Sequence, residues 1–192
     1  MSTISRLKIG QYDRMISAGV FAPRPDGRRH RIELIEGELR EMSPIGPPHE
    51  TLVDVLSEWS FEQTSRQEVR VRVQNSIGIP KLDTAPEPDV AWVKRKDYSA
   101  GRPTGSDVLL IIEVADSSLE YDCGEKADIY AAAGIADYWV VNIPDECVHV
   151  YRQPDRGRFR TLMTFSNGDE IHPLAFPEIV LPVSLLFGDQ RP

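Results

Sequence analysis

Two acidic residues and one lysine carry the chemistry that this sequence suggests. Asp89 stands at the entrance of a predicted strand, and Glu113 closes the apolar run Val108–Ile112. Lys126 lies on the helix predicted to follow, one turn after Asp122. Carboxylates from neighbouring strands are hard oxygen ligands that suit Mg²⁺, which keeps several of its waters. The spacing therefore predicts a divalent-metal site that polarises a phosphoryl oxygen and activates water, with an ammonium nearby to neutralise developing charge.

The same residues also suit purely structural roles. Carboxylates at strand ends commonly cap helices, bind water or pair with arginine. Lys126 has an alternative as an exposed helix cation paired with Asp122, which would itself be the acid at the helix N-terminus. Other chemistries lack their motifs: the sequence has no HExxH, no Gly-rich phosphate loop and no nucleophile elbow around Ser117, and its four histidines lack zinc-ligand spacing.

Composition excludes several classes of protein. The 192 residues are 41% hydrophobic and 27% charged, as in an ordinary globular domain, and no apolar run approaches the length of a membrane span. A net charge of −8, from 22 basic and 30 acidic residues, argues against a protein that coats nucleic acid through bulk charge. Cys123 and Cys147 have no CxxC spacing, so we expect free thiols in a reducing cytoplasm.

Hydrophobic periodicity predicts the elements that position these residues. The predicted elements are a helix over 5–19, a loop over 23–29, a hairpin over 31–42 that turns at Glu36-Gly37, a loop over 44–48, a helix over 49–65, strands over 68–74, 90–93 and 107–114, a helix over 121–133 stopped by Gly134, a strand over 138–141, a meander over 147–152 and 159–165, and a Pro-rich tail over 173–192. The strand–helix–strand unit around Lys126 favours parallel pairing. No linker divides the chain, which predicts a single domain of residues 1–192, with a core over about 30–152 and a C-terminal meander and tail over 147–192.

Strings of residues extend this pattern over most of the chain. They are Glu33-Leu34-Ile35-Glu36-Gly37-Glu38-Leu39, Met42-Ser43-Pro44 with His49, Val73-Gln74-Asn75, Glu87-Pro88-Asp89-Val90-Ala91, the segment from Leu110 to Asp122, Glu125-Lys126, Tyr130-Ala131-Ala132-Ala133-Gly134-Ile135 and Tyr138-Trp139-Val140-Val141. In this order they resemble the Uma-two-type putative restriction endonuclease family, which belongs to the PD-(D/E)XK nuclease superfamily. Each string alone is unspecific, whereas the ordered set is specific.

The resemblance implies a restriction-endonuclease-like core of the α/β (α+β) class, with a mixed central β-sheet flanked by helices. It makes Pro88-Asp89 the PD of the superfamily pattern and Glu113 the second acid. Ala115 stands two residues after that acid, where the superfamily pattern has lysine. The resemblance therefore implies that Lys126, on the following helix, supplies the ammonium, as a long flexible side chain can.

Several supporting positions keep two interpretations. The acid of the hairpin, Glu38, suits either a third metal ligand or a surface strand position. His49 suits either a structural contact at the start of a helix or a general base, since its pKa range fits proton transfer. The remaining candidates are Gln74 and Asp122 as polar supports, and Arg28, Arg29, Arg31, Arg70 and Arg72 as either a phosphate-contacting face or a solvated one.

These observations lead to one expected function and its rivals. We expect an endonuclease, dependent on Mg²⁺ or Mn²⁺, that hydrolyses DNA phosphodiester bonds in the cytoplasm without a membrane partner. The family resemblance and the apolar strands of the C-terminal half predict a homodimer. The alternatives are a catalytically inactive nucleic-acid-binding protein and an interaction module on the same fold, because a fold does not determine a function.

Overall fold

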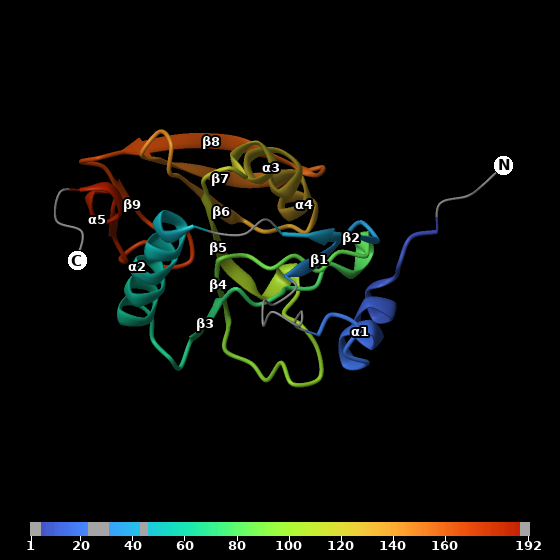
Figure 1. Cartoon of the computed structure of the whole chain (residues 1–192). Coiled ribbons are helices and arrows are strands. Elements are labelled where there is room, and N and C mark those ends of the chain that lie inside the picture. Colours follow the sequence, from blue (N-terminus) through green and yellow to red (C-terminus); the bar gives the residue numbers. More distant parts are fainter. Residues whose placement is uncertain (1–4, 23–30, 43–45, 189–192) are drawn as a thin grey trace. The chain divides into compact units, whose positions relative to one another are not determined.

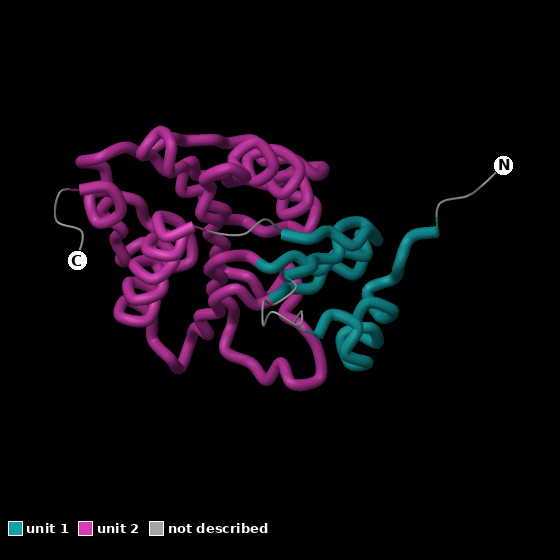
Figure 2. The backbone as a smooth tube through the Cα atoms, in the orientation of Figure 1, with its two compact units in different colours: residues 1–44, 76–87 teal, residues 45–75, 88–192 magenta. Residues whose placement is uncertain are grey.

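The computed structural model describes residues 5–22, 31–42 and 46–188 and divides the chain into two compact units, which Figure 2 colours separately. Unit 1 comprises residues 1–44 and 76–87, and unit 2 comprises residues 45–75 and 88–192. The predicted loop over 23–29, with Arg28 and Arg29, lies outside the described residues. The organisation as a single domain stays a prediction.

Unit 1 contains the predicted hairpin. Strands β1 (Ile32–Ile35) and β2 (Glu38–Glu41) pair antiparallel, with Ile35 opposite Glu38. Both turn residues have positive φ, 47° at Glu36 and 80° at Gly37, as a two-residue hairpin turn requires. The other elements are helix α1 (Ile9–Ser17), shorter than the predicted 5–19, and the 3-10 turn η1 (Pro80–Leu82).

Unit 2 is built on a six-stranded sheet in the order β3-β4-β5-β6-β7-β8 (Figure 1). Its strands are β3 (Val69–Val73), β4 (Val90–Lys94), β5 (Val108–Ala115), β6 (Asp137–Asn142), β7 (Cys147–Asp155) and β8 (Arg158–Ser166). β5 and β6 pair parallel and all other neighbours pair antiparallel. The predicted mixed central sheet and the parallel strand–helix–strand unit are therefore confirmed.

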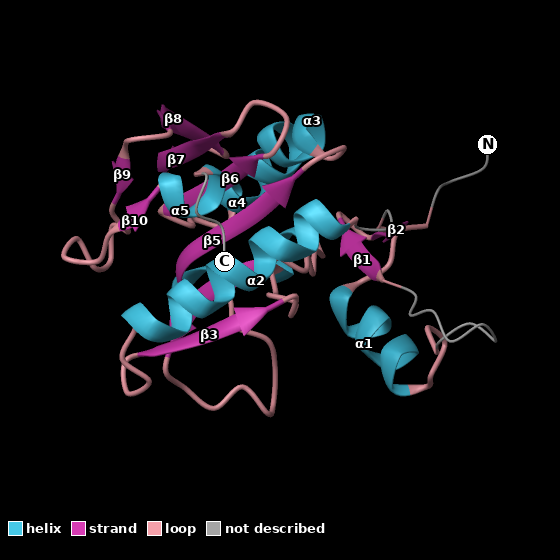
Figure 3. Cartoon of the chain, turned by 60° about the vertical axis from the view of Figure 1, so that its left-hand side comes forward, coloured by secondary structure: helices cyan, strands magenta, loops and turns pink. Residues whose placement is uncertain are grey.

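Helix α2 (Pro47–Gln63) covers one face of this sheet (Figure 3). Its buried residue Trp59 stacks on Trp92 of β4, with ring centroids 5.1 Å apart, and also contacts Trp139 of β6. The helix begins two residues before the predicted start. The predicted loop over 44–48 is therefore wrong at its last two positions, because proline suits the first turn of a helix, where its missing N–H is no loss.

The opposite face is covered by the helical segment between β5 and β6. It consists of α3 (Leu119–Tyr121), the π-helical turn η3 (Asp122–Lys126) and α4 (Ala127–Ala132). Gly134, with φ 76°, follows the helix as its predicted stop. The π-helical turn was not predicted, because a periodic pattern does not distinguish one wider turn from the regular helix around it.

The tail is less extended than predicted. β9 (Glu170–Ile171) pairs with β10 (Leu181–Pro182), and the short helix α5 (Ser184–Phe187) buries Leu186 and Phe187 in the core under α2. Among the described residues, no helix combines the length and the apolar character needed to cross a membrane.

Candidate active site

The sheet brings the two predicted acids together. β4 and β5 pair so that Val90 lies opposite Ile112, and the residues that flank this pair, Asp89 and Glu113, therefore meet at one end of two adjacent strands. The Asp89 amide donates a hydrogen bond to Glu113 Oε2 at 3.3 Å. Both side chains are buried, with 5% and 2% of their residue surfaces exposed, so their charges act on one another with little screening by water.

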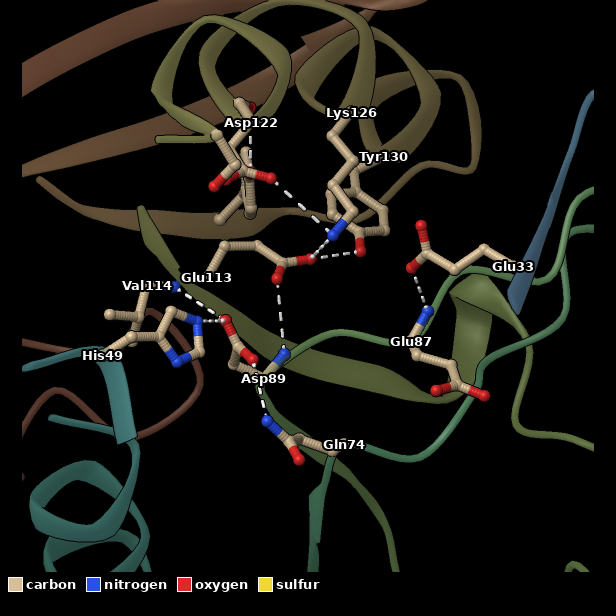
Figure 4. Close-up of polar contacts among 12 residues, drawn as sticks. Glu33, His49, Gln74, Glu87, Asp89, Glu113, Val114, Asp122, Lys126 and Tyr130 are labelled. Carbon is tan, nitrogen blue, oxygen red and sulfur yellow. Dashed lines mark hydrogen bonds and ion pairs between the residues drawn. The ribbon is translucent and has the colours of Figure 1, made fainter. Parts of the chain in front are cut away.

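Lys126 completes the group from the helical segment above (Figure 4). Its Nζ lies 2.9 Å from Glu113 Oε1 and 3.6 Å from Asp122 Oδ1. Only 3% of the lysine is exposed, so the interpretation of Lys126 as an exposed helix cation is wrong. Asp122 is buried as well and accepts a hydrogen bond from Ser118 Oγ at 2.5 Å.

Asp89 has three further polar partners within unit 2. Its Oδ2 lies 3.1 Å from His49 Nε2 and accepts a hydrogen bond from the Val114 amide at 3.0 Å. Its Oδ1 accepts one from Gln74 Nε2 at 3.3 Å. Because a carboxylate only accepts, His49 Nε2 carries the proton that is shared with Asp89. Three predicted supporting residues, His49, Gln74 and Asp122, thus lie in direct contact with the two acids or with Lys126.

Tyr130 is a member of the cluster that the sequence analysis did not single out. Its hydroxyl donates a hydrogen bond of 2.7 Å to Glu113 Oε1, the oxygen that also binds Lys126. Tyr130 follows Lys126 by four positions, and residues at that spacing share a helix face. This spacing from Lys126 was the signal in the sequence that could have placed Tyr130 in the cluster. A tyrosine in an apolar stretch, however, equally suits a position in the hydrophobic core.

Glu38 is found on the surface of unit 1. Its side chain is 46% exposed and forms ion pairs with Arg6 at 3.2 Å and Arg40 at 3.5 Å. These contacts favour the surface interpretation over that of a third metal ligand. Unit 1 also buries an acid that was not singled out: Glu33, 3% exposed, accepts a hydrogen bond from the Glu87 amide at 2.7 Å.

The two acids have opposite protonation tendencies. Burial raises the pKa of Glu113 to about 8, with the negative charges of Asp89 and Asp122 adding to this effect and Lys126 opposing it. Burial also favours the neutral form of Asp89, but the hydrogen bond and charge of His49, the charge of Lys126 and the Val114 amide lower the pKa of Asp89 below its ordinary value. Asp89 is therefore charged at neutral pH, whereas Glu113, with a pKa of about 8, is mostly protonated there.

The cluster has the charge and the donors for a divalent ion with few protein ligands. Two buried carboxylates, those of Glu113 and Asp122, contact the Lys126 ammonium, and a third, that of Asp89, lies beside Glu113. A bound cation would favour the charged form of Glu113 against the burial and the two negative charges that raise its pKa. Within the part of the chain that the structure describes, no group of three or more His, Cys, Asp or Glu side chains is arranged so that it could hold a metal ion by itself. The residues present thus fit Mg²⁺ or Mn²⁺ held by two carboxylates and water, and not a closed site such as that of structural zinc.

Comparisons with known proteins agree with this fold. The model of a family described as Uma2, putative restriction endonuclease, matches residues 11–184. Five chains of solved structures match significantly. One is a putative nuclease from Anabaena variabilis, with a TM-score of 0.71 and 13% identity over 94% of this chain and 97% of that one. No protein with a curated description matches the sequence significantly.

Proposed function

Because the chain belongs to the Uma2 putative restriction endonuclease family, we propose that it is an endonuclease that hydrolyses DNA phosphodiester bonds with the aid of Mg²⁺ or Mn²⁺. The observation that carries the proposal is the convergence of Asp89, Glu113 and Lys126. They come from the start of β4, from β5 and from the π-helical turn, yet one hydrogen bond of 3.3 Å joins Asp89 to Glu113 and one ion pair of 2.9 Å joins Glu113 to Lys126.

Each residue of the cluster has a distinct role in this proposal. Asp89 and Glu113 would hold the metal, which supplies Lewis-acid stabilisation of the charge that develops on the phosphodiester. Lys126 holds a fixed positive charge beside Glu113 and is placed to neutralise a phosphate oxygen or to orient the attacking water. Tyr130 and His49 orient the two carboxylates, a supporting shell of the kind that keeps metal ligands in place.

Cleavage of supercoiled plasmid DNA, with and without Mg²⁺, tests the proposal. We expect Mg²⁺-dependent nicking by the wild type and its loss in Glu113→Gln, which retains the shape of the side chain but carries no charge. Asp128→Asn is the matched control, because Asp128 is an exposed acid on α4, outside the cluster. Nicking that survives in Glu113→Gln would rule the proposed site out.

Binding of the metal is measured separately from cleavage. A ligand that binds only the folded state raises its stability, so MgCl₂ or MnCl₂ should raise the Tm of the wild type and of Asp128→Asn. The Tm of Glu113→Gln should not respond. An equal rise in all three proteins would show that the metal binds elsewhere.

A second function, nucleic-acid binding without catalysis, is favoured by one observation. Every carboxylate oxygen of Asp89 and Glu113 already has a partner within the protein, and Lys126 supplies a positive charge where a metal would. In a site that no longer binds a metal, these internal hydrogen bonds and the charge of Lys126 would stabilise the buried carboxylates in its place. DNA affinity without nicking at any metal concentration would favour this second function, and the absence of both would favour an interaction module.

The proposal extends to assembly and location. We propose a homodimer, supported by the edge strand β8, whose Leu162 is 56% exposed. Light scattering tests this, and a mass corresponding to one chain at all concentrations would contradict it.

We also propose a cytoplasmic protein, supported by the free thiols of Cys123 and Cys147. Fractionation of cells that produce the protein tests its location.

A further inference from the structure

Tyr138 reaches the candidate active site from β6. The residue is fully buried and pairs with Ile111 of the parallel strand β5. Side chains alternate between faces along a strand, so Tyr138 and Ile111 share a face with Glu113, which follows Ile111 by two positions. The helical segment between β5 and β6 covers this face, because both Tyr138 and Glu113 form hydrogen bonds with it.

The hydroxyl of Tyr138 is bonded to the π-helical turn that carries Lys126. It donates a hydrogen bond of 2.8 Å to the main-chain carbonyl of Asp122, the first residue of η3, and Lys126 is the last residue of this turn. A second hydroxyl, that of Tyr151 on β7, contacts the next carbonyl, that of Cys123, at 3.5 Å, which is longer than an ordinary hydrogen bond. Of these two tyrosines, Tyr138 therefore makes the stronger bond to the turn.

The ring of Tyr138 is fixed by its aromatic neighbours. It packs edge-on against Tyr130 with ring centroids 4.9 Å apart, and against Tyr151 and Phe159 with centroids 5.6 and 6.0 Å apart. Such pairs have preferred geometries and stabilise a protein beyond the burial of their surface. The hydroxyl is thus held at a defined place, and its bond ties the π-helical turn to the sheet.

The two segments that Tyr138 contacts act on the same oxygen of Glu113. Lys126 Nζ lies 2.9 Å from Glu113 Oε1, and the Tyr130 hydroxyl lies 2.7 Å from it (Figure 4). A π-helical turn is rare and differs from an α-helix in the spacing of its hydrogen bonds, so its geometry depends on contacts from outside the helix. The bond from Tyr138 is such a contact, and it meets the turn at the residue that also pairs with Lys126.

We propose that Tyr138 is a positioning residue, whose hydroxyl fixes the π-helical turn so that the Lys126 ammonium is held against Glu113 and ready for the phosphodiester. A charge that is already in place stabilises a transition state without the cost of reorganisation. This role rests on the proposed nuclease function for its kinetic consequence, but the position of Lys126 is measured without DNA or metal.

Acetylation of lysine by acetic anhydride in EDTA, followed by mass spectrometry of the peptide that contains Lys126, tests this position. Only 3% of Lys126 is exposed, so the wild type should be protected. Tyr138→Phe keeps the ring but loses the hydroxyl, and its Lys126 should react about fivefold faster, the factor expected for the loss of one neutral hydrogen bond. Tyr98→Phe is the matched control, because that hydroxyl donates a bond of the same 2.8 Å to the Lys94 carbonyl; it should change the rate by less than about twofold.

A second control separates position from general stability. Val183→Ala removes buried methyl groups from the core under α2, on the other face of the sheet, and should lower the Tm. At a temperature at which all variants are folded by circular dichroism, it should leave the acetylation of Lys126 unchanged. An equal acceleration in Val183→Ala and Tyr138→Phe would show that stability alone protects Lys126 and would overturn the proposal.

The kinetics of plasmid nicking in Mg²⁺ give a readout of the reaction itself. Tyr138→Phe should lower kcat about tenfold, because a displaced catalytic group loses its alignment, and should leave KM for DNA within about twofold, because the affected charge acts in the transition state. Incorporation of 4-aminophenylalanine at position 138 restores a hydrogen-bond donor and should recover most of kcat and of the protection of Lys126. Val183→Ala and Tyr98→Phe should retain the kcat of the wild type.

The outcomes distinguish this role from the nuclease proposal. Unchanged acetylation of Lys126 in folded Tyr138→Phe overturns the positioning role, as does an unchanged kcat where the wild type cleaves DNA. If Tyr138→Phe does not fold whereas the protein with 4-aminophenylalanine does, the bond serves the whole fold and the proposal is overturned as well. Faster acetylation in Tyr138→Phe alone, with no cleavage by the wild type, supports the positioning of Lys126 and overturns the nuclease proposal.

Discussion

Lys126 Nζ lies 2.9 Å from Glu113 Oε1, and both side chains are almost completely buried. Asp122, one turn before Lys126, contributes a second carboxylate to the same ammonium at 3.6 Å. These residues occupy a π-helical turn, and such turns often occur at functional sites. An ion pair in this setting stabilises the protein only while both partners are present, because each charge has been removed from water.

Replacing Lys126 with Met should destabilise the protein in a pH-dependent manner. At pH 9 the Glu113 carboxylate would be a buried charge without its partner, at a cost of about 3–5 kcal/mol. At pH 6 the cost should be smaller, because Glu113, whose pKa is raised to about 8 even beside Lys126, would be protonated. Urea denaturation in EDTA at both pH values measures the difference. Lys96→Met, which removes an ion pair from a half-exposed lysine, should have a far smaller effect, and equal losses for the two variants would contradict this account.

The stability of the metal-free protein should fall as the pH rises from about 5 to 8. The pKa of Glu113 is about 8 in the folded protein and near its ordinary value of 4.5 in the unfolded chain. The folded state therefore binds more protons in this window, and the free energy of unfolding decreases with pH by a few kcal/mol. Chemical denaturation in EDTA across the window measures this decrease. Glu113→Gln has no titrating group and should lack this component, so parallel pH profiles for the two proteins would refute the assignment.

Removing the Tyr130 hydroxyl should shift the titration of Glu113 upward. The hydroxyl donates a 2.7 Å hydrogen bond to Glu113 Oε1 and so favours the charged carboxylate. Tyr130→Phe should lower the free energy of unfolding by about 1.5–3 kcal/mol at high pH, and by less where Glu113 is protonated. The midpoint of the stability profile should move to higher pH. Tyr151→Phe serves as the control, since its hydroxyl makes only a 3.5 Å contact with the Cys123 carbonyl; a shift in this control of the same size would remove the special role of Tyr130.

Gly105, which lies against the end of helix α4, should not tolerate a side chain. A Cβ at Gly105, in the turn η2 (Gly105–Asp107), would overlap the carbonyl oxygen of Ala133 at the end of α4. Gly105→Ala should therefore cost about 2–3 kcal/mol, as overpacking against a backbone does, and lower the Tm. At Gly101 nothing lies within 4 Å of the added Cβ, so Gly101→Ala should leave the Tm nearly unchanged. Equal Tm values for the two variants would contradict the close contact.

The order of the elements in unit 2 was predictable because it depends on local patterns. The unbroken apolar run before Glu113 indicated a central strand, and the alternation of valine with Arg70 and Arg72 indicated one with two different faces. The same local patterns indicated that Asp89 stands at the start of a strand and that Lys126 lies on the helix that follows Glu113. Each of these patterns spans fewer than about ten residues, so side chains close together along the chain are enough to produce it.

The tertiary structure alone decided which of those residues touch. That Lys126 is buried, that His49 reaches Asp89 from the first turn of α2 and that Tyr130 shares an oxygen of Glu113 all depend on segments far apart in the chain. The same holds for the raised pKa of Glu113, whose largest cause is burial. A sequence specifies the type and spacing of its ionisable groups, whereas their solvation and partners exist only after distant segments have packed together, because both are properties of the surrounding volume.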